Sequence, residues 1–187
     1  MKYALAMLLL APGFTGNDPR FTPEGAVIRP TDYREWIFLT SGLGMSYGMR
    51  MPDTGHPDFD NVFVEPAAYK AFAATGKWPD KTMFILEVRS FLSHGSINKA
   101  GHFQSDILAI EAEVKDETRF KEKWAYVDFS YGGTLHDTAK PFDGDSACNV
   151  CHSKNAAVEN TFVQFYPTLL EVAKAKHTLN AGYNANQ

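Results

Sequence analysis

The sequence is poor in cysteine and has no concentration of positive charge. Only 2 of its 187 residues are cysteine, too few for a zinc site built from two cysteine pairs, since a structural zinc site normally needs four Cys or His ligands. The 18 Lys and Arg residues are outnumbered by 22 Asp and Glu, and the formal net charge is −4. Because no basic run marks a phosphate-binding surface, we expect no nucleic-acid partner.

The chain also lacks a long hydrophobic run. The apolar stretch from Ala4 to Leu10 is too short to cross a bilayer as a helix. It follows Lys2 and ends in the small residues around Ala11, a pattern that is typical of a secretory signal. We therefore expect residues 1–13 to be a signal peptide, with an ordinary buried N-terminal segment as the alternative.

Both cysteines lie in one short string, Cys148-Asn149-Val150-Cys151-His152. On a helix, positions i, i+3 and i+4 share one side, so the two thiols and the imidazole would face the same way. Each thiol can add to a vinyl group of haem, which leaves the imidazole beneath the iron. The string is typical of c-type haem attachment. It predicts one covalent haem c held by Cys148 and Cys151, with His152 as the iron ligand.

Other interpretations of the string receive less support. A thioredoxin-like redox pair would sit between a strand and a helix of a βαβ unit, and no such pattern surrounds residues 148–152. A disulfide between Cys148 and Cys151 would close a very short loop. For zinc, the other five histidines, His56, His94, His102, His136 and His177, show no paired ligand spacing. The redox pair and the disulfide remain alternatives.

The rest of the sequence favours a single α+β domain. Short segments rich in strand-forming residues predict strands at 34–40, 61–65, 82–88, 103–114 and 124–129. A helix is expected over 67–74, with Pro66 in its first turn and Gly76 as its C-cap. Ser146 is expected to cap the haem-bearing helix, and Pro167 to start a terminal helix. Successive strands with few helices between them favour a predominantly antiparallel sheet, with the haem attached near the C-terminal helices.

Several stretches in consistent order resemble the cytochrome P-460 family, which includes the cytochromes c′-beta. They are residues 33–36, 61–66, 109–116, 123–126, 148–152 and 162–167. The resemblance spans about residues 28–175, and we assign the haem domain to 28–178. It implies a mostly antiparallel β fold, a covalent haem and commonly a homodimer. Members of the family oxidise hydroxylamine or bind nitric oxide.

One position departs from the hydroxylamine-oxidising members of the family. These have a lysine that cross-links to the haem, and Leu86 occupies its place here, directly before Glu87. A leucine has no nitrogen that could bond a haem carbon. Lys99, in the following loop, is a possible substitute, although a solvated loop residue is the simpler interpretation. The departure favours the c′-beta type, without a cross-link.

The resemblance also suggests which residues surround the iron. With Leu86 facing the haem, strand alternation places Phe84 and Val88 on the same face. Phe142, just before the motif, could close the pocket, as could Phe38, Phe59 or Phe63, and ordinary core packing is the alternative for each. Glu111 matches a distal carboxylate of the hydroxylamine-oxidising members and could act as an acid or base, whereas its position alone suggests a solvent-facing strand residue. Glu87 and Arg89 are expected to pair at the sheet surface.

Taken together, the motif and the resemblance predict an exported, periplasmic monohaem cytochrome. Thioether attachment of haem occurs outside the bacterial cytoplasm, which agrees with the signal peptide. We expect an open, hydrophobic distal pocket that binds nitric oxide or a related nitrogen ligand. If the protein is an enzyme, we expect a haem oxidoreductase acting on hydroxylamine or nitric oxide. Plain electron transfer, with an unidentified redox partner, would need a sixth ligand, which Met45, Met49 or Met51 could supply.

Overall fold

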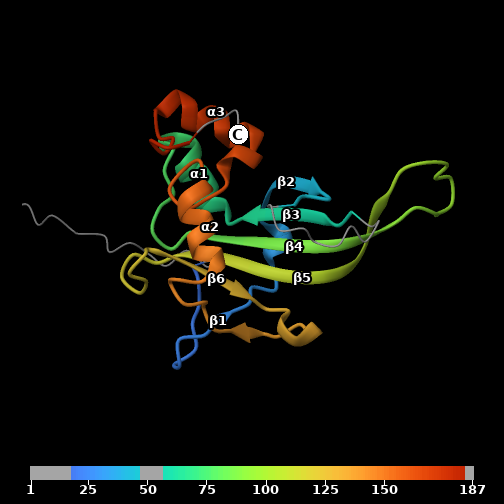
Figure 1. Ribbon diagram of the computed structural model, residues 1–187, viewed down its shortest axis with the longest axis horizontal. Coiled ribbons are helices and arrows are strands. Elements are labelled where there is room, and N and C mark those ends of the chain that lie inside the picture. The colour runs from blue at the N-terminus through green and yellow to red at the C-terminus, as the bar shows by residue number, and fades with distance from the viewer. Residues whose placement is uncertain (1–17, 47–56, 184–187) are drawn as a thin grey trace, which may run out of the picture.

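The computed structural model describes residues 18–46 and 57–183, and an antiparallel sheet organises this part of the chain (Figure 1). The expected signal peptide and two of the loop methionines, Met49 and Met51, lie outside the described residues. In spatial order, the strands of the main sheet are β2 (Ile37–Leu43), β3 (Phe59–Val64), β4 (Met83–Leu92), β5 (Phe103–Lys115) and β6 (Trp124–Asp128). Each strand pairs with the next one along the chain, so the sheet is a simple meander.

Three α-helices and a small second ladder complete the described part of the fold. The helices are α1 (Pro66–Thr75), α2 (Ala147–Asn155) and α3 (Pro167–Lys176). Strands β1 (Val27–Ile28) and β7 (Thr138–Ala139) form the ladder, and short 3-10 turns occur at Tyr33–Glu35, Tyr131–Gly133 and Val163–Phe165. This confirms the α+β class with mainly antiparallel pairing. Within the same residues, no helix has the length and apolar character needed to cross a membrane.

The helix boundaries agree closely with those predicted. Pro66 occupies the first turn of α1, and Gly76 ends this helix with φ +73°, a left-handed conformation that suits glycine. The Glu65 carboxylate caps the first turn by accepting from the backbone N–H groups of Ala67 and Ala68 at 2.8 and 2.5 Å. Pro167 begins α3, as expected.

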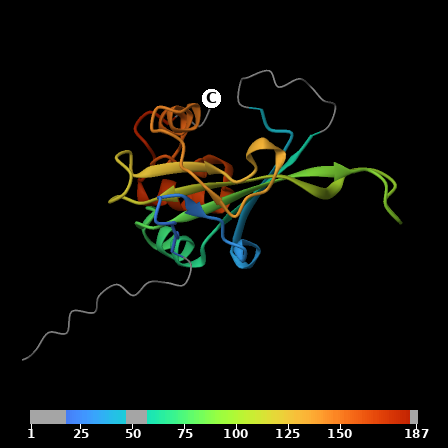
Figure 2. The same cartoon turned by 90° about the horizontal axis from the view of Figure 1, so that it is seen from below.

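Three strand boundaries, in two strands, differ from the prediction by three residues or more. The first strand begins at Ile37 rather than Arg34, because residues 33–35 form a 3-10 turn, and it continues to Leu43, three residues beyond its predicted end. Its polar end is held by pairing with β3, where Gly42 lies opposite Asp60. The strand predicted over 82–88 extends to Leu92, since β4 and β5 form a long hairpin. Figures 1 and 2 show this hairpin reaching beyond the rest of the described chain.

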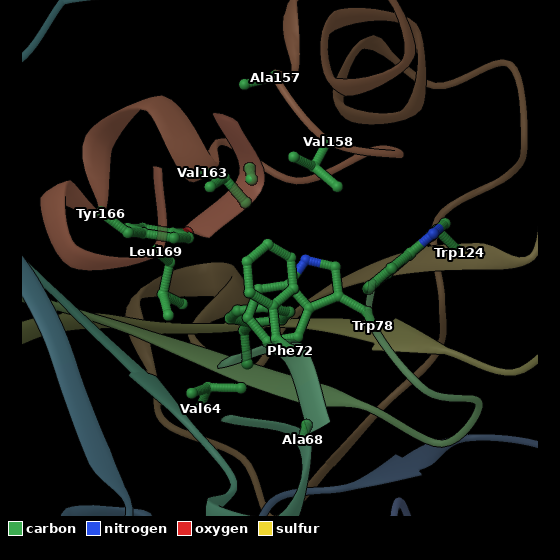
Figure 3. Close-up of a cluster of buried hydrophobic side chains, with 12 residues drawn as sticks. Val64, Ala68, Phe72, Trp78, Trp124, Ala157, Val158, Val163, Tyr166 and Leu169 are labelled. Carbon is green, nitrogen blue, oxygen red and sulfur yellow. The ribbon is translucent and has the colours of Figure 1, made fainter. Parts of the chain in front are cut away.

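The sheet has apolar layers on both faces. One face packs Val64, Phe84 and Trp124 against α1 and α3, with Phe72 and Trp78 at the centre of the cluster (Figure 3). The Phe72 and Trp78 rings lie 4.1 Å apart between centroids, and those of Trp78 and Phe84 4.7 Å apart. These large buried rings anchor the helices on the sheet.

The opposite face forms a second core with the N-terminal segment. Its buried strand residues are Met83, Ile85, Ile110, Ala112, Val114 and Val127, and they pack against Val27, Tyr33 and Trp36. With both faces of the sheet buried near the helices, alternate residues of β5 and β6 have fixed directions. The residues between those of the second core point toward the helices and toward the Cys148–His152 string.

Strand register defines which residues share the helix-facing side with this string. Leu86 lies between Val62 of β3 and Glu111 of β5, and Glu111 in turn pairs with Asp128 of β6. Phe84 pairs with Glu113, two residues nearer the helices. Paired residues and those two apart along a strand share a face. One row of side chains therefore runs from the helix-covered core out along the sheet.

Candidate functional site

The Cys148–His152 string lies on the short helix α2, which packs against β6. Ser146 caps the helix, as predicted: its hydroxyl accepts from the backbone N–H of Asn149 at 3.4 Å. Cys148, Cys151 and His152 are partly buried, whereas Val150, on the other side of the turn, is 54% exposed. The helix therefore presents both thiols and the imidazole on its inner side. Neither cysteine forms a disulfide.

The His152 imidazole has a defined orientation. Its Nδ1 lies 2.8 Å from the backbone carbonyl oxygen of Asn160, and the ring packs between Tyr126 and Phe162, with centroid distances of 4.1 and 4.2 Å. A carbonyl can only accept, so Nδ1 carries the hydrogen and donates it to Asn160. This leaves the lone pair on Nε2, the arrangement that metal-ligating histidines commonly adopt.

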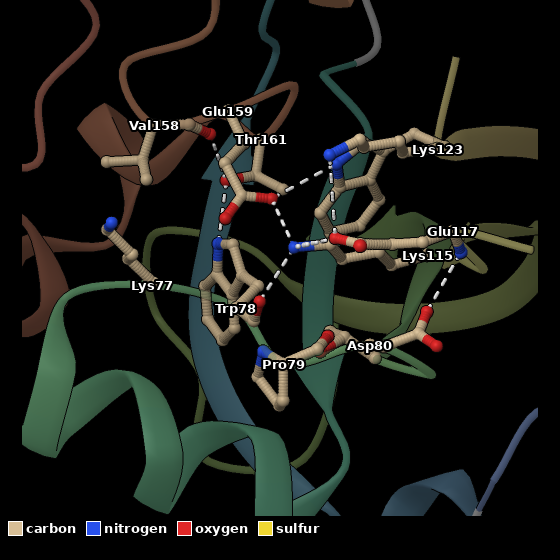
Figure 4. Close-up of polar contacts among 12 residues, drawn as sticks. Lys77, Trp78, Pro79, Asp80, Lys115, Glu117, Lys123, Val158, Glu159 and Thr161 are labelled. Carbon is tan, nitrogen blue, oxygen red and sulfur yellow. Dashed lines mark hydrogen bonds and ion pairs between the residues drawn. The ribbon is translucent and has the colours of Figure 1, made fainter. Parts of the chain in front are cut away.

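The loop that holds Asn160 is itself braced from several directions (Figure 4). The buried Lys115 ammonium donates to the Glu159 carboxylate at 2.8 Å and to the Trp78 carbonyl at 2.7 Å. The Trp78 indole N–H donates to the Thr161 hydroxyl at 2.9 Å. Because Glu159 and Thr161 flank Asn160, these bonds fix the position of its carbonyl, and through it the His152 ring.

A buried carboxylate lies behind the same imidazole. Glu113 is 8% exposed, and its Oε1 lies 3.5 Å from His152 Nδ1. Burial raises the pKa of Glu113 above its usual range, although His152 and Tyr126 favour the charged form. Burial alone would lower the pKa of His152, but the nearby charge of Glu113, together with the Asn160 carbonyl, raises it. The two groups are therefore electrostatically coupled.

Further out along the sheet, three carboxylates lie near one another. Glu111 and Asp128 are cross-strand partners, and Asp60 is on the same side of β3. Glu111 is exposed as a residue, but the surrounding protein partly desolvates its carboxylate. This desolvation, with the charges of Asp128 and Asp60, raises the pKa of Glu111, and nearby His152 opposes the rise. We refer to Asp60, Glu111 and Asp128 as the carboxylate patch.

The carboxylate patch lies close to the thiols as well. Burial raises the pKa of the Cys148 thiol, and the charges of Glu111 and Asp128 add to that effect. The half-buried Leu86 sits directly beside Glu111. The structure thus gathers Cys148, His152, Leu86 and Glu111 around one region between α2 and the sheet. That region is lined by carboxylates as well as apolar side chains.

Phe84 and Phe142, two of the aromatic residues proposed for the pocket, lie in different environments. Phe84 is 2% exposed and packs among Trp78, Trp124 and Tyr166, so core packing accounts for its position. Phe142 is 41% exposed, its backbone N–H donates to the Tyr126 carbonyl at 2.9 Å, and with Asp128 it borders a shallow depression beside β6. Of the two rings, only that of Phe142 lies open beside the site region.

Three further phenylalanines do not face α2. Phe63 pairs with Ile85 of the second core and packs edge-on against Tyr33 and Phe38. Alternation along β3 puts Phe59 on the same side as Phe63. The suggestion that these rings close the pocket is therefore wrong, because they belong to the opposite face of the sheet.

Glu87 and Arg89 pair, as predicted, but not at the surface. Glu87 is 3% exposed, and it accepts hydrogen bonds from Arg89, Arg34 and the Tyr33 hydroxyl. The expectation of a surface pair failed because Tyr33 and the N-terminal segment cover this face. Lys99 is exposed in the loop of the β4–β5 hairpin, at the other end of the sheet from α2 (Figure 1).

Two groups that lie behind the His152 imidazole, Glu113 and the Asn160 carbonyl, were not predicted from the sequence. Glu113 follows Glu111 by two residues, so the alternation that placed Glu111 also places Glu113 on the helix-facing side. Strand alternation could therefore have identified Glu113 from the sequence. No sequence pattern identifies the Asn160 carbonyl, since a backbone acceptor is defined only by how its loop folds. Asp60 and Asp128 likewise come together only through strand register.

The donor set is chemically suited to a covalently attached haem. Two thiols one helical turn apart would supply the attachment points, and Nε2 of His152 is the nitrogen left to bind iron. The buried Glu113 is a further indication, because a carboxylate behind a ligating imidazole is a common partner of metal-bound histidine.

Comparison with known proteins was made by family model and by sequence search. The family model described as Cytochrome P460 matches residues 30–163, which is most of the chain and includes all of α2. The match confirms the resemblance inferred from the sequence, and it supports a haem-binding cytochrome with iron as its metal. A search of the curated proteins found no match.

Proposed function

Since the chain belongs to the cytochrome P460 family, we propose that it is an exported c-type cytochrome whose single haem binds nitric oxide or a related small nitrogen compound. Cys148 and Cys151 would form the thioethers, and His152 Nε2 would ligate the iron. The haem supplies an iron position at which a small ligand binds. One observation carries this proposal: α2 presents both thiols and an imidazole whose Nδ1 is already engaged by Asn160 at 2.8 Å.

Position 86 carries leucine in place of the cross-linking lysine, which supports binding rather than oxidation of the ligand. In this proposal Leu86 contributes an apolar surface beside Glu111 and makes no covalent bond to the haem. Val62 lies opposite Leu86 on β3 and Val88 two residues along β4, so apolar side chains extend this surface. A neutral diatomic ligand fits such a lining without requiring a charged partner.

The proposal is tested on protein coexpressed with the cytochrome c maturation machinery. Intact mass should exceed that of the processed chain by one haem. The Cys148→Ala/Cys151→Ala double variant should lack the increment. Absorption spectra of the ferric and ferrous forms, with and without nitric oxide, should show five-coordinate iron that changes spectrum on adding the ligand. A wild-type protein without the haem increment, or with six-coordinate iron in both oxidation states, contradicts the proposal.

The carboxylate patch favours a second candidate, the oxidation of hydroxylamine. This reaction removes electrons and protons together, and Glu111, with its raised pKa, could accept a proton from the substrate while an external acceptor takes the electrons. Turnover of hydroxylamine with an electron acceptor distinguishes this function from simple binding. If it occurs, we expect Glu111→Gln to lower kcat. No turnover above that of free haem would exclude it.

We extend the proposal to location and assembly. Periplasmic export rests on the N-terminal sequence and on the compartment in which haem is attached, and the homodimer rests on the family. Fractionation of cells producing the full chain tests the first. Analytical ultracentrifugation of the holoprotein tests the second, with a monomer mass at micromolar concentration as the contrary outcome.

A further inference from the structure

Glu113 is a carboxylate buried in the helix-covered core, with His152 and Tyr126 as the groups that stabilise its charge. It pairs with Phe84 and Tyr126 across the sheet, in the row that runs into the helix-covered core. Burying a carboxylate among aromatic rings is costly unless the group has a hydrogen-bonding or ionic partner. Among the described residues, Glu113 Oε1 has no hydrogen-bond partner. An apolar side chain would fill the same space at lower cost.

The geometry points to His152 as the group on which Glu113 acts. Oε1 lies 3.5 Å from Nδ1, slightly beyond hydrogen-bond distance, while the neutral carbonyl of Asn160 accepts the Nδ1 hydrogen at 2.8 Å. Two acceptors, one charged and one neutral, thus lie close to the same hydrogen. The Lys115–Glu159 ion pair and the Trp78–Thr161 bond hold the carbonyl in place, so it keeps the hydrogen and the carboxylate adds its charge from behind.

We propose that Glu113 is a positioning residue that acts through His152, making the imidazole a stronger electron donor to the haem iron. The inference rests on the proposed function. A negative charge behind Nδ1 stabilises positive charge on the ring and raises the basicity of Nε2, which favours the ferric over the ferrous state. In the haem-loaded protein the same polarisation would strengthen the bond between His152 Nε2 and the iron. Glu113 therefore tunes the strength of this bond and the potential together.

The test uses the haem-loaded Glu113→Gln protein, in which the side chain keeps its shape and loses its charge. We expect a lower iron–histidine stretching frequency in the resonance Raman spectrum of the ferrous form. We also expect a higher midpoint potential, seen as a roughly tenfold larger ferrous-to-ferric ratio at a fixed applied potential. Glu171→Gln, the same change at a 71% exposed carboxylate on α3, should change neither quantity.

A second variant, Glu113→Asp, keeps the charge and moves it away from Nδ1. It should shift the iron–histidine frequency and the midpoint potential in the same direction as Glu113→Gln but by less. If the Glu113→Gln protein fails to fold or to attach haem, the Glu113→Asp protein tests the role of Glu113 instead. Haem-loaded variants with the wild-type frequency and potential overturn the role of Glu113 alone. A wild-type protein that attaches no haem overturns the proposed function, and this inference with it.

Discussion

At the scale of single residues, the two β5 carboxylates illustrate how a shift of two positions changes chemical role. Glu113 is enclosed behind an imidazole, whereas Glu111 opens toward solvent beside Leu86. Both lie on the same face of one strand. Their separation along that strand is about 7 Å, enough to move from one side of His152 to the region beside the thiols.

Glu111 should control how ligand binding depends on pH. Desolvation and the charges of Asp128 and Asp60 raise its pKa, so it becomes protonated at a higher pH than a solvent-exposed glutamate does. Protonated Glu111 can donate a hydrogen bond to a bound ligand, and we expect affinity for nitric oxide to increase roughly fivefold as the pH falls through that pKa. Spectroscopic titrations between pH 4 and 8 measure this.

Two variants make the assignment specific. Glu111→Gln should give a flat profile, and Asp128→Asn should move the midpoint to lower pH because one repelling charge is gone. Asp106→Asn, an exposed position nearer the hairpin loop on β5, serves as the control. A Glu111→Gln protein with the wild-type profile would remove Glu111 from the site.

Glu87 should stabilise the fold in a pH-dependent manner. Burial alone would raise the pKa of Glu87, but hydrogen bonds from Arg89, Tyr33 and Arg34 lower it below the usual value. A carboxyl whose pKa is depressed in the folded state adds stability above its unfolded pKa of about 4.3, and that contribution is lost as the pH falls through the folded value. Glu87→Gln should therefore cost about 3 kcal/mol at pH 7 and less below pH 4.

Urea unfolding at a series of pH values measures this difference. Glu35→Gln, at an exposed carboxylate of the neighbouring 3-10 turn, is the matched control and should have little effect. A cost for Glu87→Gln that is constant from pH 3 to 7 would show that the network contributes packing rather than charge.

At the scale of elements, the loop of residues 158–161 connects the packed core to the candidate site. Lys115 is nearly enclosed, and the side chain of its partner Glu159 is 27% exposed. Lys115→Met should cost about 2 kcal/mol of unfolding free energy, since it leaves Glu159 without its cation. It should also shift the ferrous iron–histidine frequency, because the loop around Asn160 loses one of the bonds that hold it. Urea unfolding and resonance Raman spectra test the two effects.

The Lys174–Glu171 pair on α3 offers the control for this prediction. Its 2.8 Å separation equals that of Lys115 and Glu159, but both side chains are exposed. Lys174→Met should change stability by about 0.5 kcal/mol or less and leave the Raman spectrum as it was. Equal costs for the two substitutions would indicate that the loop is held by other contacts.

The order and type of the five main-sheet strands and the three α-helices could be predicted from the sequence because local signals were strong. Pro66, Gly76, Ser146 and Pro167 mark helix ends through backbone chemistry that needs no tertiary context. The extension of β2 into Ser41-Gly42-Leu43 could not be predicted, because pairing with β3 overrides the turn preference of glycine. The burial of Glu87 was missed for a related reason, since alternation gives a face but not what covers that face.

Some residues of the candidate site could likewise be predicted from local sequence, and others only from the folded structure. Cys148, Cys151 and His152 are evident from spacing alone. The choice among aromatic residues needed the strand register, which sends Phe63 to the opposite face and encloses Phe84 in the core. The Asn160 acceptor and the carboxylate patch depend on segments that are far apart in the chain, and only the folded structure brings them together.

At the scale of the whole molecule, the β4–β5 hairpin is separate from the helix-covered end of the sheet. Its loop carries the exposed Ile97 and Lys99. Replacing residues 93–101 with an Asn-Gly turn should leave haem attachment, the ferrous spectrum and the unfolding midpoint close to wild type. Loss of haem incorporation in the shortened protein would show that the loop contributes to the site.

The position of α2 in the chain has a consequence for maturation. A polypeptide that leaves a translocation channel N-terminal end first has delivered β2 to β6 before Cys148 emerges. The five strands of the main sheet, and Glu113 with them, would thus precede the thiols, whereas Asn160 and the core residues of α3 follow them. Under the proposed function, the sheet could then form while Cys148 and Cys151 are still accessible for haem attachment. Closure of the 158–161 loop behind His152 would come after that step.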